Sequence, residues 1–209
     1  TLTTQGDILY RNGSGLARLG YGTAGQVLKT GGSGANPSWA TVSGTFKSMN
    51  HVIYGTGQVL QSQGSTTNAK FTNLAVTVTP QSASSKFLIS ATINGEANNE
   101  PWDYVLNFVR TVSGSDTDLA SANGISNTSG SGAEGIACLP TSYSSGSNND
   151  STPEGTSFSF VDTPNTTSAI TYSPSFKGGS NGSAGFSLNR TVGGGSGEVF
   201  VSTMYVMEF

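Results

Sequence analysis

The last segment of the chain, residues 199–209 (VFVSTMYVMEF), is apolar on both sides if it is extended. Successive side chains of a strand point to opposite faces. One face then holds Val199, Val201, Thr203, Tyr205, Met207 and Phe209, and the other holds Phe200, Met204 and Val206. A strand in an antiparallel sandwich usually packs only one face. We therefore expect one neighbour to be the subunit's own core and the other to be a second copy of the chain, with Phe200, Met204 and Val206 at the contact between copies.

The composition favours many short strands joined by turns. Only 34% of the 209 residues are hydrophobic and 10% are charged, whereas 29 are glycine. Disordered chains combine low hydrophobicity with high net charge, and here the net charge is only −3. The length predicts one sizeable domain plus an arm. The slightly acidic balance argues against nucleic acid as a partner, and no apolar run is long enough to predict membrane insertion.

Alternating apolar residues from Phe46 onward predict strands. Three sets share a face in this pattern: Leu74, Val76 and Val78; Phe87, Ile89, Ala91 and Ile93; and Trp102, Tyr104, Leu106 and Phe108. Further strands are expected around Phe158, Ile170 and Phe186, with two short ones near 118–122 and 135–139, and a turn at Asn94-Gly95. No helical periodicity extends over more than two turns. The sequence therefore predicts an all-β sandwich or jelly roll of about eight to ten strands.

The chain offers few groups for catalysis or metal binding. It has one histidine, His51, and one cysteine, Cys138, so neither a zinc set nor an internal disulfide can form, and we expect Cys138 to be buried. The G-x-S-x-G match at 178–182 lacks the following helix that a nucleophile elbow needs. We predict no catalytic residue, no cofactor and no metal site, although acidic clusters such as Asp116/Asp118 could bind calcium weakly. Carboxylate pairs leave a polysaccharide-degrading spike as an alternative.

Residues 1–44 differ from the rest because their apolar residues come in twos and threes between glycine turns. Too few stand together to close a core in one chain. Such a segment can be ordered when three copies wind together, and the alternative is a flexible linker. The motif GDILYRNGSGLARLGYGTAGQVLKT, followed by NPSWATV, resembles a module of tail-fibre and other virion proteins of tailed bacteriophages. This resemblance covers nearly all of residues 4–42.

Residues 45–209 also resemble a phage family. The segments PQSASSKFLISATI, NFVRTVSG, SFVDTPNTTSAITYSPSF, FSLNRTV and VSTMYVMEF are similar to the distal domain of tail-fibre-like proteins from phages of cyanobacteria and other marine bacteria. Phe209 stands where that family more often has Ile, and residues 115–156 depart from it. The resemblance implies a homotrimeric, non-enzymatic virion appendage. Its distal end would touch the host, and the part before Thr1 would join other virion tail proteins.

Together these observations predict a short intertwined β-rich stalk, residues 1–44, and a trimeric jelly-roll head, residues 45–209. The head would bind a bacterial surface glycan or lipopolysaccharide, since three heads on one axis multiply a weak sugar affinity. The polar stretch that contains Tyr143, Asn148, Asn149 and Asp150 is the candidate contact, because an aromatic face and amide or carboxylate groups suit a sugar. The alternatives are a purely structural head fibre or tail component, the degrading spike, and a cellular trimeric signalling protein.

Overall fold

The computed structural model describes residues 1–42, 46–61, 68–97, 104–125, 133–138, 153–178, 185–191 and 199–209. The chain divides into two compact units, Thr1–Thr45 and Phe46–Phe209.

The amino-terminal unit consists of two β-hairpins. In the first, β1 (Ile8–Arg11) pairs with β2 (Leu16–Leu19), and in the second, β3 (Gln26–Lys29) pairs with β4 (Ser38–Thr41). The Asn12 side chain closes the first turn, because its Oδ1 accepts hydrogen bonds from the backbone N–H of Ser14 (2.8 Å) and Gly15 (2.9 Å). Asparagine is favoured in turns for this kind of bond.

Trp39 connects the two hairpins. Its indole N–H donates to the carbonyl of Gly20 at 2.6 Å, and a Cβ at Gly22 would lie 2.8 Å from the Trp39 ring, so this position must be glycine. No residue of the described range 1–42 is buried. Leu9, Leu16, Tyr21 and Leu28 are between 49% and 76% exposed. As predicted, one copy of this segment makes no core of its own.

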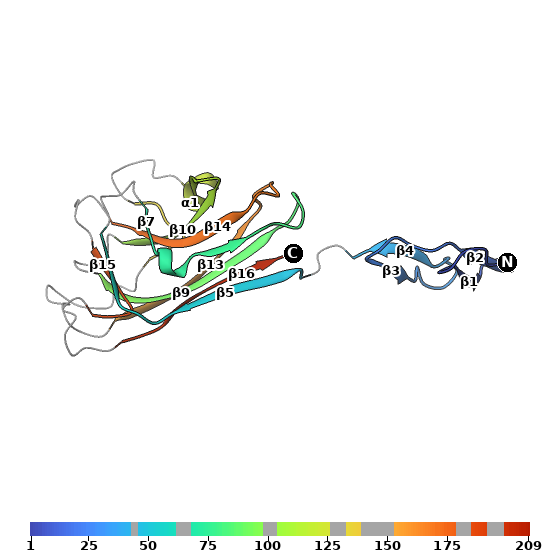
Figure 1. The fold of residues 1–209 in the computed structure, drawn as a ribbon, viewed down its shortest axis with the longest axis horizontal. Coiled ribbons are helices and arrows are strands. Elements are labelled where there is room, and N and C mark those ends of the chain that lie inside the picture. The colour runs from blue at the N-terminus through green and yellow to red at the C-terminus, as the bar shows by residue number, and fades with distance from the viewer. Residues whose placement is uncertain are drawn as a thin grey trace. The chain divides into compact units, whose positions relative to one another are not determined.

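The head, residues 46–209, is a sandwich of two antiparallel sheets (Figure 1). The β16 sheet contains β5 (Ser48–Tyr54), β6 (Gln58–Gln61), β9 (Phe87–Ala97), β13 (Glu154–Asp162), β15 (Gly185–Leu188) and β16 (Ser202–Glu208). The β10 sheet contains β7 (Ala69–Lys70), β8 (Val76–Val78), β10 (Val105–Val112), β11 (Ser115–Asp118), β12 (Ala137–Cys138) and β14 (Ile170–Lys177). A 3₁₀ turn, η1 (Thr72–Leu74), and one short helix, α1 (Leu119–Ala122), complete the described elements of the head.

The strand order is that of a jelly roll. The twelve described strands of the two sheets occupy eight strand positions, four in each sheet. Two successive short strands share one position in four cases: β5 with β6, β7 with β8, β11 with β12, and β15 with β16. With the eight positions numbered along the chain, the β16 sheet has the order 1-8-3-6 and the β10 sheet has the order 5-4-7-2. Chain crossings between two four-position sheets of this kind define the jelly roll. The predicted fold class is confirmed.

The core lies between the sheets and is rich in aromatic rings. Phe71, Phe176 and Phe186 pack with ring centroids 5.5 to 5.7 Å apart, and Phe108 stacks on Phe158 across the two sheets at 4.5 Å. The predicted inward faces are correct for β8 and for β9, where Phe87, Ile89, Ala91 and Ile93 are at most 1% exposed. Tyr104, Leu106 and Phe108 are also buried as predicted.

Two local predictions were wrong. Asn94-Gly95 is not a turn, because β9 continues through it to Ala97. Gly95 is needed there because a Cβ would lie 2.4 Å from both the Phe186 ring and the Ser187 carbonyl. Residues 119–122 form α1 rather than a strand, since the Asp118 carboxylate accepts from the Ser121 N–H and caps a helical turn.

A partly buried ion pair joins the sheets. Arg110 of β10 donates to both carboxylate oxygens of Asp162 on β13, at 2.8 and 2.9 Å, and the Tyr172 hydroxyl donates to the same carboxylate at 2.7 Å. Burial and the charge of Asp162 raise the pKa of Tyr172, so its hydroxyl stays a donor. Both contacts come from one guanidinium nitrogen, Nη1, and together with the Tyr172 bond they link the two sheets through charge-assisted hydrogen bonds.

Candidate functional site

The chain enters the head and ends at the same end of the sandwich. The Lys47 N–H donates to the Glu208 carbonyl at 2.8 Å, and Phe46 packs edge-to-face on Phe209 at 6.2 Å. The Glu208 carboxylate is buried and accepts from the Gln81 N–H (2.7 Å) and the Ser85 hydroxyl (2.6 Å). Polar contacts therefore anchor this end, which we call the entry end.

At the opposite end of the head, the strands stop next to several connecting segments. On the β16 sheet, Gln61 lies opposite Gly185, Ala97 opposite Phe186, and Glu154 opposite Gly95. On the β10 sheet, Val105 lies between Cys138 and Lys177. We call this the far end.

The connection from Cys138 to Pro153 leaves from and returns to the far end. The predicted receptor-contact residues Tyr143, Asn148, Asn149 and Asp150 belong to this connection and lie outside the described residues.

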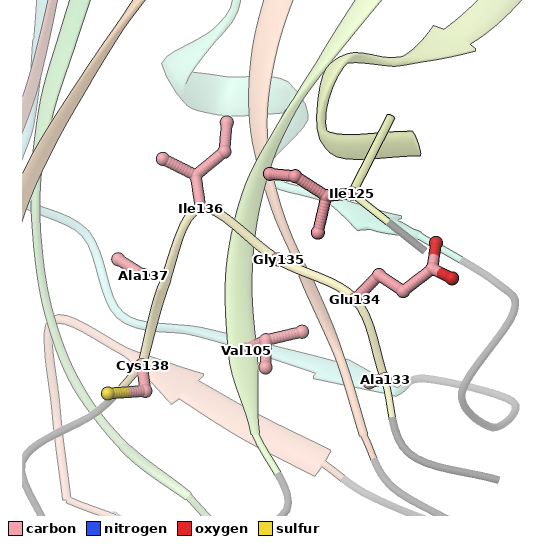
Figure 2. Close-up of a pocket in the computed structure, with 8 residues that line it drawn as sticks. All are labelled: Val105, Ile125, Ala133, Glu134, Gly135, Ile136, Ala137 and Cys138. Carbon is pink, nitrogen blue, oxygen red and sulfur yellow. The ribbon is translucent and has the colours of Figure 1, made fainter. Parts of the chain in front are cut away.

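An open hollow of about 420 Å³ lies beside β12 (Figure 2). It is lined by Val105, Ile125, Ala133, Glu134, Gly135, Ile136, Ala137 and Cys138. The lining is apolar apart from Glu134, whose carboxylate accepts from the Ser121 hydroxyl at 2.7 Å. The hollow thus offers an apolar surface and one acidic group at its rim, without an aromatic ring among its lining residues to stack on a sugar.

Cys138 is exposed, so the prediction that it is buried was wrong. It lies on β12 at the edge of the β10 sheet, opposite Val105. Val105 belongs to the set of β10 residues that points away from the core, and its cross-strand partner Cys138 shares that face. Burial of free cysteine is a statistical tendency, and the position on the strand decides the case.

The structure corrects the prediction that Met204 and Val206 lie at a contact between copies. These side chains are 0% and 1% exposed and belong to the core of the single chain, while Phe200 is half-buried. The sequence pattern misled because this inward face also carries Ser202 and Glu208. Both are buried through hydrogen bonds, Ser202 with the Asn189 side chain (2.6 Å) and Glu208 with Gln81 and Ser85.

The opposite, outward face of the β16 sheet is partly exposed, and it carries no charged residue between a row of Lys47, Phe209 and Lys86 at the entry end and the far end of β13. The cross-strand register places its side chains in three rows over β5, β16, β9 and β13. The rows are Met49–Met207–Leu88–Val161, His51–Tyr205–Ser90–Ser159 and Ile53–Thr203–Thr92–Ser157. The first row, nearest the entry end, is entirely apolar, with Met49 48% and Val161 58% exposed. In the second row His51 stacks on Tyr205 at 5.9 Å.

The outward face of the β10 sheet is covered by the chain itself. Helix α1 lies on this side (Figure 1) and contacts β10, and Val109 and Ala120 are at most 1% exposed. Asp118 forms an ion pair with Lys177 and accepts hydrogen bonds from Asn107 and from Asn68 (2.9 Å). Burial alone would raise the pKa of Asp118, but the hydrogen bonds from Lys177, Asn68 and Asn107 outweigh it and lower the pKa to about 2.

The two aspartates of the predicted calcium cluster take part in ion pairs. Asp116 binds Lys70 at 2.7 Å and Asp118 binds Lys177, so both members of the predicted weak calcium cluster have a lysine as partner. Within the described residues, no group of three His, Cys, Asp or Glu side chains could hold a metal ion. A search of the same residues finds no helix that could span a membrane.

Comparisons with known proteins add little. No protein-family model matches the chain, and no curated protein matches it. Among solved structures, the chain is similar to that of the Gt strain of infectious bursal disease virus, with 13% identity and a TM-score of 0.38 over 93% of this chain and 44% of the other. The crystal structure of the VP2 subviral particle of infectious bursal disease virus gives 12% identity and a TM-score of 0.34, over 93% and 43%. The chain thus spans less than half the length of these proteins, and likeness at this level carries no argument about function.

Proposed function

We propose that this chain is the distal part of a bacteriophage tail fibre, which trimerises and binds a host-surface glycan or lipopolysaccharide. The observation that supports trimerisation is the amino-terminal unit. Its two hairpins are held by specific bonds, yet none of its described residues is buried and Leu16 is 76% exposed. Two-stranded hairpins are at best marginally stable in water unless their apolar residues are covered. Other copies of the same segment supply that cover.

The jelly-roll head supports the receptor-binding part of the proposal through its two different ends. The entry end is closed by the buried Glu208 and by backbone bonds to Lys47 and Lys86. The polar connection that holds Tyr143, Asn148, Asn149 and Asp150 starts after Cys138 and ends before Pro153, and both of these described residues lie at the far end. Loops on a rigid scaffold commonly carry recognition, and an uncharged sugar needs aromatic and amide groups rather than a strong field.

Two measurements test the proposal. Mass photometry of the full chain should give three chains per particle, and a monomer at micromolar concentration would contradict trimerisation. The purified trimer should bind cells of some strains in a panel of cyanobacteria and other marine bacteria, and glycan or lipopolysaccharide extracted from those strains should compete. A trimer that binds no strain of the panel would favour a purely structural virion fibre, and release of reducing sugars from the extract would favour a degrading spike.

A further inference from the structure

We infer that the outward face of the β16 sheet is the surface through which neighbouring heads contact one another. This inference rests on the proposed trimer and assigns the surface that the sequence pattern had placed on Met204 and Val206. The occupant of the face is a second copy of this chain, with the β5 edge of one head beside the β13 edge of the next. A closed threefold ring requires such a contact between two different patches.

The chemistry of the face supports a copy of itself as the occupant. Its three rows contain no Asp, Glu, Lys or Arg, and its first row is Met49, Met207, Leu88 and Val161. Two identical surfaces of this kind bring no like charges together, whereas burying unpaired charges would be costly. Tyr205, on which His51 stacks, and the two methionines are residue types enriched at the centre of interfaces.

The apolar row adjoins further exposed rings at the entry end. Phe46 and Phe209, 54% and 36% exposed, pack edge-to-face just beyond Met49 and Met207. The exposed apolar surface of the first row therefore continues to Phe209, which Lys47 and Lys86 flank in the next cross-strand row. Contiguous apolar surface of this kind marks an interaction site more often than scattered single residues do.

The outward face of the β16 sheet is small, so contact between heads depends on their link to the amino-terminal segments. Four strands about 4.8 Å apart and three rows about 7 Å apart give a plan area of roughly 400 Å². Stable pairs of free proteins bury about 800 Å² per partner. The face is thus too small to hold free heads together. Since only three residues separate Val42 from Phe46, heads whose amino-terminal segments associate would meet at an effective concentration on the order of millimolar.

Site-directed disulfides test the assignment in the full chain. In a Cys138→Ser background, the double variant Met49→Cys/Val161→Cys places thiols on the two edges of the first row. The matched control, Thr77→Cys/Asp116→Cys, places them on the two edges of the outward face of the β10 sheet, since Thr77 pairs with Thr171 and Asp116 pairs with Thr111. The edges of one sheet are about 14 Å apart. A disulfide needs Cβ atoms within about 4.5 Å, so intramolecular bonds do not form.

After mild oxidation, the Met49→Cys/Val161→Cys chain should run as a covalent trimer on a denaturing non-reducing gel. The control and both single cysteine variants should run as monomers. Two results would show that a trimeric wild type uses another contact surface. In one, the control pair cross-links as much as the test pair, and in the other the test pair does not cross-link. Dimers from a single variant would indicate twofold contacts and overturn the threefold arrangement. A monomeric wild type would overturn the proposed function and this inference with it.

Discussion

The outward faces of the two sheets of the head differ in how far the chain itself covers them. The β10 sheet is covered by its own chain, through α1 and a network in which Asp118 binds Lys177, Asn107 and Asn68. The β16 sheet leaves Met49, Ile53 and Val161 between 48% and 61% exposed. Charged groups are thus used where the chain satisfies them itself, and they are missing where we propose that another copy lies. The first face should matter for folding and the second for association.

Removing Asp118 should produce the largest effect. Asp118→Ala leaves the Lys177 ammonium, whose side chain is only 4% exposed, without its carboxylate, and it also removes the cap of α1. Breaking one side of a buried ion pair costs about 3–5 kcal/mol. Urea unfolding should show this loss in the free energy of unfolding. The matched control is Asp116→Ala on the same strand, whose pair with Lys70 is exposed and worth at most about 1 kcal/mol. Equal losses for both variants would contradict the comparison.

A matched pair of valines tests the two faces directly. Val109 on the covered face is 1% exposed, and Val161 on the open face is 58% exposed. Val109→Ser should lower the free energy of unfolding by about 2–3 kcal/mol, because it loses a buried apolar side chain and buries a hydroxyl. Val161→Ser should change it by less than about 0.5 kcal/mol at protein concentrations where the chain is dissociated.

The concentration dependence completes that test. If Val161 lies between copies, the Tm of wild type should rise with protein concentration more steeply than the Tm of Val161→Ser. If the Tm of the two proteins rises equally with concentration, Val161 does not lie at a contact between copies.

The sequence predicted the fold where one side of a strand is plainly apolar. In β9, Phe87, Ile89, Ala91 and Ile93 alternate with Leu88, Ser90 and Thr92, and the inward face was correct. The same reasoning failed for β16, since both of its faces are apolar and the inward one contains the buried Ser202 and Glu208. Which residues align in rows across four strands depends on long-range register. Met49, Leu88, Val161 and Met207 are far apart in sequence, so no local pattern could have brought them together.

Acid should weaken the covered face selectively. The folded pKa of Asp118 is lowered from 3.8 to about 2, so its contribution to stability is fully present above the unfolded pKa of 3.8. That contribution is lost as the pH falls from about 4 through about 2, and a shift of this size corresponds to about 2 kcal/mol.

The acid effect is isolated by comparing wild type with Asp118→Asn, in which position 118 does not titrate. The difference between their free energies of unfolding, measured in urea from pH 7 to pH 2, should be constant down to about pH 4 and should shrink below it. Val161→Ser, on the face without acidic residues, should instead keep a constant difference from wild type over the whole range. A difference for Asp118→Asn that stays flat to pH 2 would mean that the carboxylate on the covered face does not support the fold.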